Sequence, residues 1–299
     1  MSDEGRYGSP AAFRRALTDR LRAAAEDSVW SLQELQRQFS YDRLLARLYT
    51  SDEGWIVKGA TALIARGIAV RSTIDIDIYR ARPAEEAEAE LRRACRHDLD
   101  DRFSFELGPT QPVNDGAGVR IKVDAYIGAT PWSQFHVDLV GSDLRMTGQP
   151  DEVPAIAIVE MPQIRQSGYL VYPLVDHIAD KVCAILQRYG PAEAPSTRFK
   201  DLVDLVAIII TTPVDGEDQT AALGSEAKRR GLVLPGTFDV PDRELWAQGY
   251  RAEVNRSTLP TAHALDEAVD IVRGFVDPVL KGHGHGTWKP GAQEWDERE

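Results

Sequence analysis

Apolar side chains recur at helical spacing near the start of the chain. Phe13, Leu17 and Leu21 are four residues apart, and a similar leucine stripe continues as far as Leu48. Because an α-helix completes a turn every 3.6 residues, such a stripe lies along one face. The pattern predicts two packing helices, over residues 10–25 and 31–49.

The hydrophobic period then shortens to two. Residues 55–57 form a short apolar run that ends at Lys58-Gly59-Ala60-Thr61, after which residues 62–65 resume as the first turns of a helix. Residues 74–79 alternate strictly, with isoleucine at every second position and Asp75, Asp77 and Tyr79 between. Successive side chains of a strand point to opposite faces, so this segment is predicted as a half-buried strand with both aspartates on one face.

The rest of the pattern separates a strand-rich part from a helical part. Strands, the last two joined as a hairpin, are predicted at 103–107, 119–127 and 135–140. Helices are predicted at 83–97, 176–189, 198–210 and 262–280, with Thr197 as an N-cap. The proline-containing connector 141–162 stands between the two parts. We therefore expect a first lobe over 1–160, a helical lobe over 161–282 and a polar tail over 283–299.

Composition and charge exclude several classes of protein. The chain has 299 residues, 43% hydrophobic side chains and a net charge of −12, which argues against non-specific coating of nucleic acid through an overall positive field. No apolar run reaches the roughly 20 residues that span a bilayer, and the start lacks the apolar core of a secretory signal. A cytoplasmic protein is expected. Cys95 and Cys183 stand far apart, which indicates neither a disulfide framework nor a zinc site.

The alternating acids are the first candidate chemistry. On a strand, the Cα atoms of Asp75 and Asp77 lie about 6.5 to 7 Å apart, so the two carboxylates can meet at one cation. Two hard oxygen ligands, with room for water and phosphate oxygens, suit Mg²⁺ at a phosphoryl-transfer site. A simpler interpretation is that Asp75 and Asp77 are ordinary acidic side chains on a solvent-exposed strand face. Acids are poor strand formers, however, and neighbouring like charges repel unless something binds between them.

The segment before the acids favours a phosphate ligand. At Lys58, Gly59, Ala60 and Thr61 a predicted strand meets a helix N-terminus, where glycine admits a phosphate to the backbone and free N–H groups face it. One glycine before a helix is a weak indication by itself. The acid strand about a dozen residues later strengthens it.

A third acid is expected across the sheet, and two candidates exist. Asp138 lies in an apolar strand, where an unpaired charge would be costly, and it is the favoured choice. Asp124 shares a strand face with Arg120 and Lys122, which could neutralise it.

The helical part offers a lysine and two acids. Lys181 lies one step off the apolar stripe of its predicted helix, and Asp201 and Asp204 are three residues apart on the next. From the helices alone, Lys181 is more simply a solvent lysine beside Asp180. The acid pair is more simply a surface that is salt-bridged to neighbouring basic residues.

These segments in this order resemble the AbiEii/AbiGii-type nucleotidyltransferase toxins, including the mycobacterial MenT group, within the polymerase-beta-like nucleotidyltransferase superfamily. The resemblance spans most of the chain and rests on residues 57–63, 72–77, 180–184 and 198–205. The last two segments are the most specific. The chain departs from the family at Ala60, where a second glycine is usual. Backbone N–H donors survive that change, so altered loop geometry rather than inactivity is expected.

The resemblance implies a fold and a set of site residues. The fold is α+β and bilobed, with a mixed-sheet catalytic lobe and a mainly helical C-terminal lobe. Metal binding is implied for Asp75 and Asp77, while Asp138 remains the predicted third ligand. The later motifs match Lys181 and Asp204, which reverses the solvent interpretation. Arg198 and Asp201 lie alongside them, and Arg198 is expected to bind the nucleotide.

The resemblance also implies a function. The expected protein is the toxin of a bacterial toxin–antitoxin or phage-defence pair that transfers a nucleoside monophosphate from an NTP to RNA, with Mg²⁺ or Mn²⁺ as cofactor. The 3′ end of tRNA is the expected acceptor, so that translation is blocked, and an antitoxin encoded nearby is the expected partner. A rival enzyme activity is transfer to a small molecule such as an aminoglycoside. A non-catalytic binding module is the third alternative, against which Asp75, Asp77 and Lys181 count.

Regulatory phosphorylation is expected at Thr73. Thr73 lies two residues before Asp75, so strand periodicity places its hydroxyl on the carboxylate face. A phosphate there adds roughly 1.5 to 2 negative charges where the nucleotide phosphates must sit. Some antitoxins of the toxin group that the chain resembles are themselves similar to kinases. Ser72 is an adjacent competitor, and the alternative role of Thr73 is pairing with a neighbouring strand.

Overall fold

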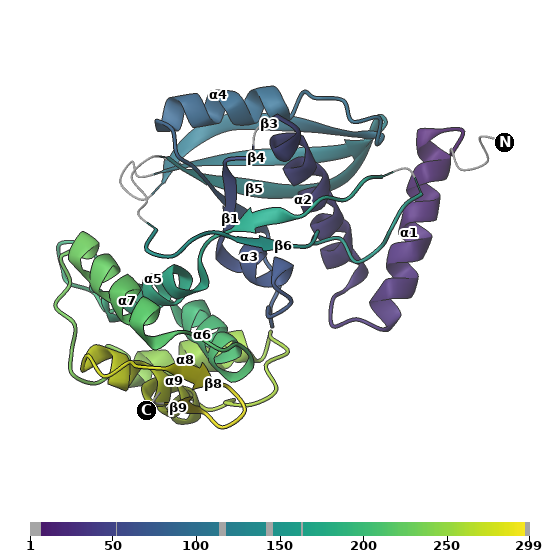
Figure 1. The fold of residues 1–299 in the computed structure, drawn as a ribbon. Helices are drawn as coiled ribbons and strands as arrows, with labels where there is room; N and C mark the ends of the chain where they lie inside the picture. The colour runs from purple at the N-terminus through teal and green to yellow at the C-terminus, as the bar shows by residue number, and fades with distance from the viewer. Residues whose placement is uncertain (1–6, 52, 114–117, 142–145, 163, 297–299) are drawn as a thin grey trace. The chain divides into compact units, whose positions relative to one another are not determined.

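The protein consists of two compact units. The computed structural model describes residues 7–51, 53–113, 118–141, 146–162 and 164–296. The first unit comprises Met1–Arg66, Ser72–Leu144 and Asp151–Val171, and the second comprises Gly67–Arg71, Arg145–Pro150 and Tyr172–Glu299. The fold class is α+β, as predicted (Figure 1).

Among the residues that the structure describes, the first unit contains four helices. They are α1 (Pro10–Glu26), α2 (Leu32–Ser51), α3 (Gly59–Ala65) and α4 (Ala84–Ala94). Helix α1 begins where the Ser9 hydroxyl accepts a hydrogen bond from the backbone N–H of Ala12, with Pro10 at its first position. The predicted stripe of Phe13, Leu17 and Leu21 is buried. The helix is therefore held by its apolar face.

A seven-stranded mixed sheet forms the centre of the first unit. Its strands are β1 (Trp55–Lys58), β2 (Asp75–Arg80), β3 (Phe103–Val113), β4 (Gly118–Ile127), β5 (Thr130–Val140), β6 (Asp151–Val153) and β7 (Tyr169–Val171). Their order across the sheet is β3-β4-β5-β2-β1-β7-β6. Strand β2 runs parallel to β5 and antiparallel to β1. The acid strand thus lies at the centre of the sheet.

The two faces of β2 differ, as the alternation predicted. Ile76 and Ile78 are fully buried in the core, to which Val137 and Leu139 of β5 also belong. Helices α2 and α4 contact β5, and Figure 1 shows α4 lying along strands β3 to β5. Ile74 is outside the core, with 55% of its surface exposed, because the strand begins one residue later than predicted. Polar side chains occupy the opposite face.

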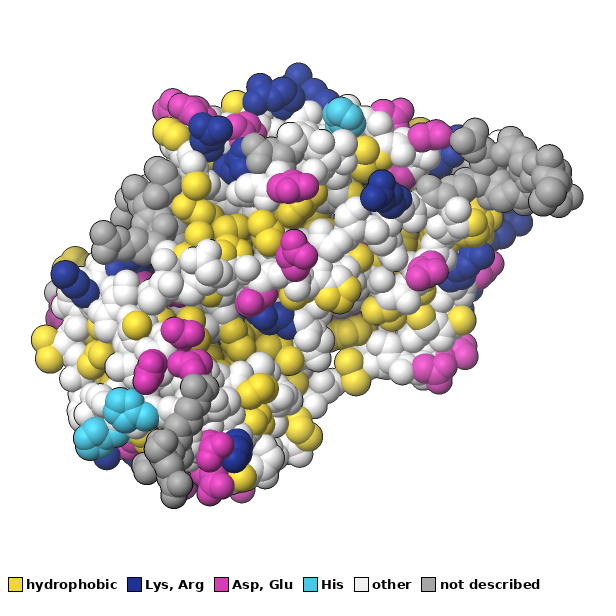
Figure 2. Space-filling view, viewed as in Figure 1, with side chains coloured by type: hydrophobic (Ala, Val, Ile, Leu, Met, Phe, Trp, Pro, Cys, Tyr) yellow, Lys and Arg dark blue, Asp and Glu magenta, His cyan; other side chains and the backbone are white. Residues whose placement is uncertain are grey.

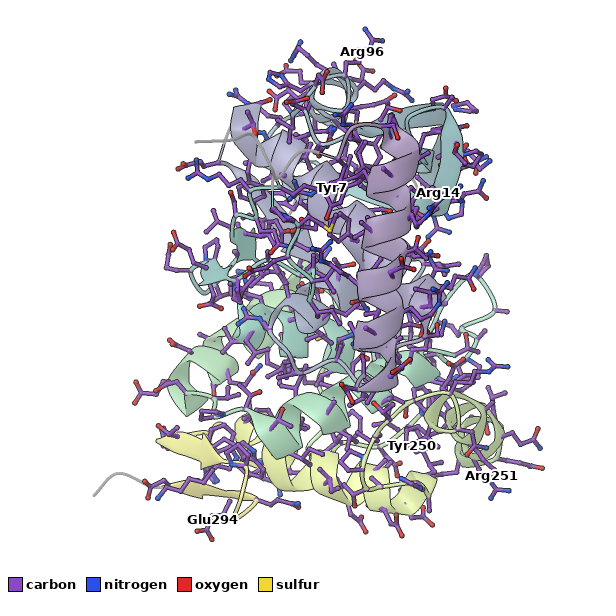
Figure 3. The ribbon with its side chains drawn as sticks, turned by 90° about the vertical axis from the view of Figure 1, so that its right-hand side faces the viewer. Tyr7, Arg14, Arg96, Tyr250, Arg251 and Glu294 are labelled. Carbon is purple, nitrogen blue, oxygen red and sulfur yellow. The ribbon has the colours of Figure 1, made fainter. Side chains whose placement is uncertain are left out.

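The second unit is mainly helical. It contains α5 (Leu174–Leu186), α6 (Phe199–Thr211), α7 (Gly216–Arg230), α8 (Arg243–Val254) and α9 (Leu265–Leu280). The sequence analysis did not predict α7 or α8. Helix α8 buries Tyr250 and exposes Arg251 (Figure 3). The predicted N-cap of α6 was wrong, because Arg198 rather than Thr197 occupies that position.

The segment expected to be a polar tail contains a small hairpin, β8 (Thr287–Lys289) and β9 (Glu294–Asp296). Trp288 is 1% exposed, and its indole N–H donates to the Ile209 carbonyl at 2.7 Å. Its ring packs edge-on against Phe275. Aromatic burial therefore orders a segment whose composition is polar. In the described part of the chain, no helix has the length and apolar character required to cross a bilayer.

Candidate active site

Asp75 and Asp77, the two aspartates predicted to bind a metal ion, lie on the polar face of β2. In the register of the sheet, Asp75 is opposite His136 and Asp77 is opposite Asp138 on the parallel neighbour β5. On the other side, Asp77 is opposite Lys58 of β1. Both aspartates are partly exposed. The sheet therefore presents two neighbouring carboxylates to solvent, as the strand pattern predicted.

Gly59 is required by a close approach to Asp77. Its φ is +59°, and a Cβ atom at this position would lie 1.9 Å from Asp77 Oδ2. Only glycine adopts this backbone at little cost and leaves room for the carboxylate. From the sequence, Gly59 was expected to admit a phosphate to the backbone. The structure shows that it admits a side chain of the acid strand.

The neighbours of Gly59 lie at the junction between β1 and α3, against the acid strand β2. Thr61 is fully buried, and its hydroxyl donates to the Asp75 carbonyl at 3.1 Å. Lys58 is the half-buried N-cap residue of α3, and Ala60 is buried. The start of α3 thus fixes the backbone of the acid strand. Nucleotide binding by Lys58, Gly59, Ala60 and Thr61 stays a prediction.

Asp138 is not an unpaired acid. It forms a bidentate ion pair with Arg120. The Nε and one terminal nitrogen of Arg120 donate to the two carboxylate oxygens of Asp138 at 2.7 and 2.6 Å. From the sequence, Arg120 was expected to neutralise Asp124 instead. Asp124 accepts a hydrogen bond from Gln134 and lies 3.3 Å from Lys122. Cross-strand register decides the pairing, since Arg120 is directly opposite Asp138.

Arg120 also approaches the acid pair. One of its terminal nitrogens lies 3.6 Å from Asp75 Oδ2. Its hydrogen bonds to Asp138, aided by the charges of Asp138, Asp75 and Asp77, raise the pKa of the guanidinium above its usual value. This face of the sheet is therefore an anionic centre that already holds one cationic side chain.

His136, on the same strand as Asp138, was not predicted from the sequence. Its Nδ1 lies 3.2 Å from Asp75 Oδ1, and both atoms are buried without a hydrogen-bond partner among the described residues. The available signal was its position two residues before Asp138, which places both side chains on one strand face.

The orphaned oxygen of Asp75 allows a test of whether the acids fit a divalent cation. A buried carboxylate oxygen without a donor is unfavourable unless a cation or proton reaches it. Mg²⁺ is commonly held by one or two carboxylates together with water and substrate phosphates, so a complete protein cage is not required. In the described part of the chain, no group of three His, Cys, Asp or Glu side chains suited to a metal occurs. Asp75 and Asp77 fit a cation that the substrate helps to bind.

The lysine and aspartate motifs meet inside the second unit. Lys181 of α5 donates to Asp201 at 2.8 Å and to Asp204 at 2.7 Å, both on α6. Arg71 donates to both oxygens of Asp204, at 2.8 and 2.6 Å. Lys181 is 6% exposed and Asp204 only 1%. The interpretation of Lys181 as a solvent lysine was therefore wrong, and so was that of Asp204 as a surface acid, whereas Asp201 is partly exposed and lies 4.0 Å from Arg198.

Charge in this cluster is stabilised by mutual pairing. Burial alone lowers the pKa of Lys181, but Asp201 and Asp204 more than offset it, so the net pKa is raised. For Asp204, burial raises the pKa, and Lys181 and Arg71 bring it down to about 2. Both groups are ionised at neutral pH. The sequence pattern gave no indication that Arg71 is a partner of Asp204.

The remaining predicted site residues are Arg198 and Thr73. The Arg198 side chain is 55% exposed and lies 4.0 Å from Asp201. The Thr73 hydroxyl donates to the Asp75 carbonyl at 3.1 Å and accepts from the Asp75 N–H at 3.2 Å. Arg37 and Tyr41 of α2 both donate to the Thr73 carbonyl. Thr73 thus belongs to the backbone support of Asp75.

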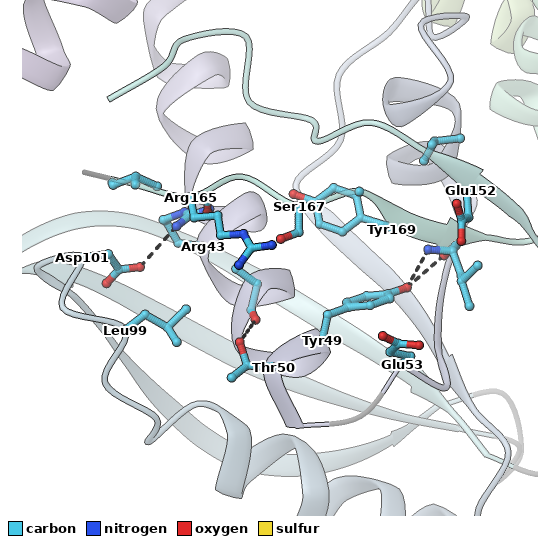
Figure 4. Close-up of a pocket in the computed structure, with 15 residues that line it drawn as sticks. Arg43, Tyr49, Thr50, Glu53, Leu99, Asp101, Glu152, Arg165, Ser167 and Tyr169 are labelled. Carbon is cyan, nitrogen blue, oxygen red and sulfur yellow. Dashed lines mark hydrogen bonds and ion pairs between the residues drawn. The ribbon is translucent and has the colours of Figure 1, made fainter. Parts of the chain in front are cut away.

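A hollow elsewhere in the first unit does not contain the predicted site. Its volume is about 850 Å³, and its lining includes Arg43, Tyr49 and Asp101 (Figure 4). Arg43 pairs with Asp42 and lies 3.7 Å from Asp101, so the buried charges at its wall are balanced. On the face shown in Figure 2, described basic side chains lie scattered among acidic ones rather than in one continuous field.

Comparisons with known proteins identify the family. The family model described as nucleotidyl transferase AbiEii toxin, type IV toxin–antitoxin system, matches residues 43–271. Among solved structures, the nucleotidyltransferase toxin MenT4 from Mycobacterium tuberculosis H37Rv shares 14% identity at a TM-score of 0.51, over 89% of this chain and 98% of that one. JHP933 from Helicobacter pylori shares 15% identity at a TM-score of 0.46, over 82% and 91%. No curated protein matches significantly. The chain belongs to the AbiEii family of nucleotidyltransferase toxins.

Proposed function

We propose that this toxin transfers a nucleoside monophosphate from an NTP to RNA, with the 3′ end of tRNA as acceptor and Mg²⁺ or Mn²⁺ as cofactor. The observation that carries the proposal is the pair Asp75 and Asp77 on one strand face, with Asp75 Oδ1 buried and lacking a hydrogen-bond partner among the described residues. The family assignment supports the reaction class. A cognate antitoxin and a cytoplasmic location belong to the same proposal.

The reaction is a phosphoryl substitution. A hydroxyl oxygen of the acceptor bonds to the α-phosphorus of the NTP, the bond to the bridging oxygen breaks, pyrophosphate leaves, and the hydroxyl proton passes to solvent. A divalent cation at Asp75 and Asp77 would neutralise phosphate charge and lower the barrier to attack. Asp138 is the proposed third ligand, and binding through it would require its carboxylate to leave Arg120.

The protein's own groups have distinct proposed roles. Lys58, Gly59, Ala60 and Thr61 lie near the triphosphate, and Lys181 offers it a positive charge. Asp204 orients Lys181, because its carboxylate lies 2.7 Å from the ammonium. Arg198, with its exposed side chain, contacts nucleotide or RNA phosphates. Such fixed charges contribute to catalysis by holding the phosphates in line for attack.

The test is incubation of the purified protein with each labelled NTP and total bacterial RNA. Label is expected at tRNA 3′ ends, and Asp75→Asn or Asp77→Asn should abolish it while circular dichroism shows an unchanged fold, since each substitution removes charge with little change in shape. Wild-type rates in either variant would remove the metal assignment. Label found only on added aminoglycosides would favour the small-molecule alternative.

A further inference from the structure

A second hollow of the first unit is lined by one face of helix α1. Its volume is about 660 Å³, and α1 contributes residues at helical spacing, among them Arg15, Thr18 and Arg22. The turn between β4 and β5, at Ala129 and Thr130, forms another part of its wall. All of its lining residues belong to the first unit. We call this hollow the arginine groove.

Positive charge predominates in the arginine groove. Three arginines line it, Arg14, Arg15 and Arg22, against one acid, Asp19, which pairs with Arg22 at 3.1 Å. Arg14 donates only a long hydrogen bond, of 3.5 Å, to the Pro131 carbonyl. Arg15 is exposed and forms no ion pair with any described residue. The groove therefore presents cationic side chains on a protein whose net charge is −12.

The other polar residues of the groove suit the same kind of ligand. They carry hydroxyl and amide groups, on Ser9, Thr18, Thr130 and Gln36. Guanidinium, hydroxyl and amide groups are the side chains with which proteins contact the phosphate and sugar oxygens of nucleic acids. Arg15 and Arg22 are seven residues apart, which is a rise of about 10 Å along the helix. Phosphates of one duplex strand rise by about 3.4 Å each, so this helix face is long enough to contact more than one of them.

The groove is remote from the acid strand. Thr130 is the first residue of β5, and His136, which is opposite Asp75, is six residues further along the strand. The rise of a strand puts about 20 Å between them. One or two nucleotides bound at Asp75 would not reach the groove, whereas roughly six base pairs would cover that length.

We propose that the arginine groove binds the sugar–phosphate backbone of the acceptor RNA at a distance from its 3′ end. This inference rests on the proposed function, because it takes RNA as the substrate. It assigns Arg14 and Arg15 to affinity for the body of the RNA and gives them no part in the chemistry. Backbone contacts of this kind position the nucleic acid without reading its base sequence.

The first test is fluorescence anisotropy of labelled tRNA with the full-length protein over a range of salt concentrations. Arg14→Ala/Arg15→Ala should weaken binding and make the slope of log affinity against log salt shallower by about 1.4 to 1.8, which is two contacts at 0.7 to 0.9 each. Arg93→Ala/Arg96→Ala is the matched control, since it removes the same charge from two exposed arginines at the end of α4. Figure 3 shows Arg96 well apart from Arg14. Equal slopes for the two variants would overturn the inference.

The second test separates binding from chemistry. Arg14→Ala/Arg15→Ala should raise the KM for tRNA with little change in kcat, and it should have little effect on transfer to a short single-stranded RNA that cannot reach the groove. A lower kcat on that short RNA, at an unchanged melting temperature, would contradict the assigned role.

Two further outcomes distinguish this inference from the function on which it rests. If the parent labels tRNA but the groove variant binds tRNA with parental affinity and slope, the proposed function stands and the inference fails. If the parent labels no RNA and the groove variant instead loses affinity for poly-glutamate, the groove binds an acidic protein segment, and both assignments fail.

Discussion

At the scale of single residues, burial changes the meaning of a charge. Lys181 and Asp204 look like ordinary surface residues when each helix is considered alone, yet both are almost completely inaccessible. A buried ammonium is stable only when opposite charges and hydrogen bonds replace its water. Two acids on α6 supply them. A charged cluster of this kind is costly to maintain, which favours a functional role.

The first prediction concerns this cluster. Lys181→Ala and Asp204→Ala should each lower nucleotidyl transfer by orders of magnitude, because a positioned charge for the triphosphate is lost or misdirected. Lys200→Ala should have a much smaller effect, since Lys200 is exposed on the same helix as Asp204. Initial rates are measured below the melting temperature of each variant, because an unpaired buried charge also destabilises the fold. Parental nucleotide binding and turnover in Lys181→Ala would refute the role.

A second prediction concerns Thr73. Phosphorylation there should stop transfer, because the hydroxyl contacts the Asp75 backbone and a phosphate would add about two negative charges beside the acid pair. Thr73→Glu should be inactive in a transfer assay and should no longer arrest growth. Thr73→Val loses the two hydrogen bonds without adding charge, and it should retain much more activity. Ser72→Glu tests the neighbouring hydroxyl, and full activity in Thr73→Glu would exclude the switch at this position.

At the scale of elements, the first turn of α3 packs directly against strand β2, which contains Asp75 and Asp77. Gly59 makes room for the Asp77 carboxylate, and Thr61 binds the Asp75 carbonyl. The start of α3 therefore supports the backbone of Asp75 and leaves room for the Asp77 carboxylate. A change in α3 should act on metal binding even where it touches no nucleotide.

The third prediction compares two glycines. Gly59→Ala should severely reduce metal-dependent activity, because the new methyl group would collide with Asp77 in addition to straining the backbone. Gly67 also has a positive φ, of +71°, but nothing lies within 4 Å of a Cβ placed there. Gly67→Ala therefore reports backbone strain alone. Equal activities for the two variants, measured with their melting temperatures, would show that the contact with Asp77 is unimportant.

At the scale of the whole molecule, an acidic protein must bind a polyanion through few contacts. The net charge is −12, and some of the arginines that could contact RNA phosphates already form ion pairs within the chain. Arg71 is held by Asp204, and Arg66 is paired with Asp151. Arg198 keeps a largely exposed side chain. RNA binding should therefore be modest and should depend on a small number of phosphates.

The fourth prediction is the salt dependence of that binding. If about three phosphates are neutralised, tRNA affinity should fall roughly twentyfold between about 50 and 200 mM salt, from a slope near −0.7 per single-stranded phosphate contact. Arg198→Ala should make the slope shallower by about 0.7, the contribution of one phosphate contact. Fluorescence anisotropy with labelled tRNA measures both. A slope that is unchanged in Arg198→Ala would remove this residue from the RNA contact.

The sequence by itself determined the local features of this protein. Strict alternation in β2 placed Asp75 and Asp77 on one face, and helical spacing located α1, α2, α5, α6 and α9, because side-chain periodicity is a property of neighbouring residues. The motif order also predicted the family, and the family model confirmed it. Helices α7 and α8 were missed.

Only the tertiary structure decided which charges meet. Sheet register paired Arg120 with Asp138 and placed His136 opposite Asp75. Packing of α5 on α6 buried Lys181, and Arg71, far away in sequence, became the partner of Asp204. The physical reason is that ion pairing and burial depend on distances between segments that are remote along the chain, and local periodicity contains no information about those distances.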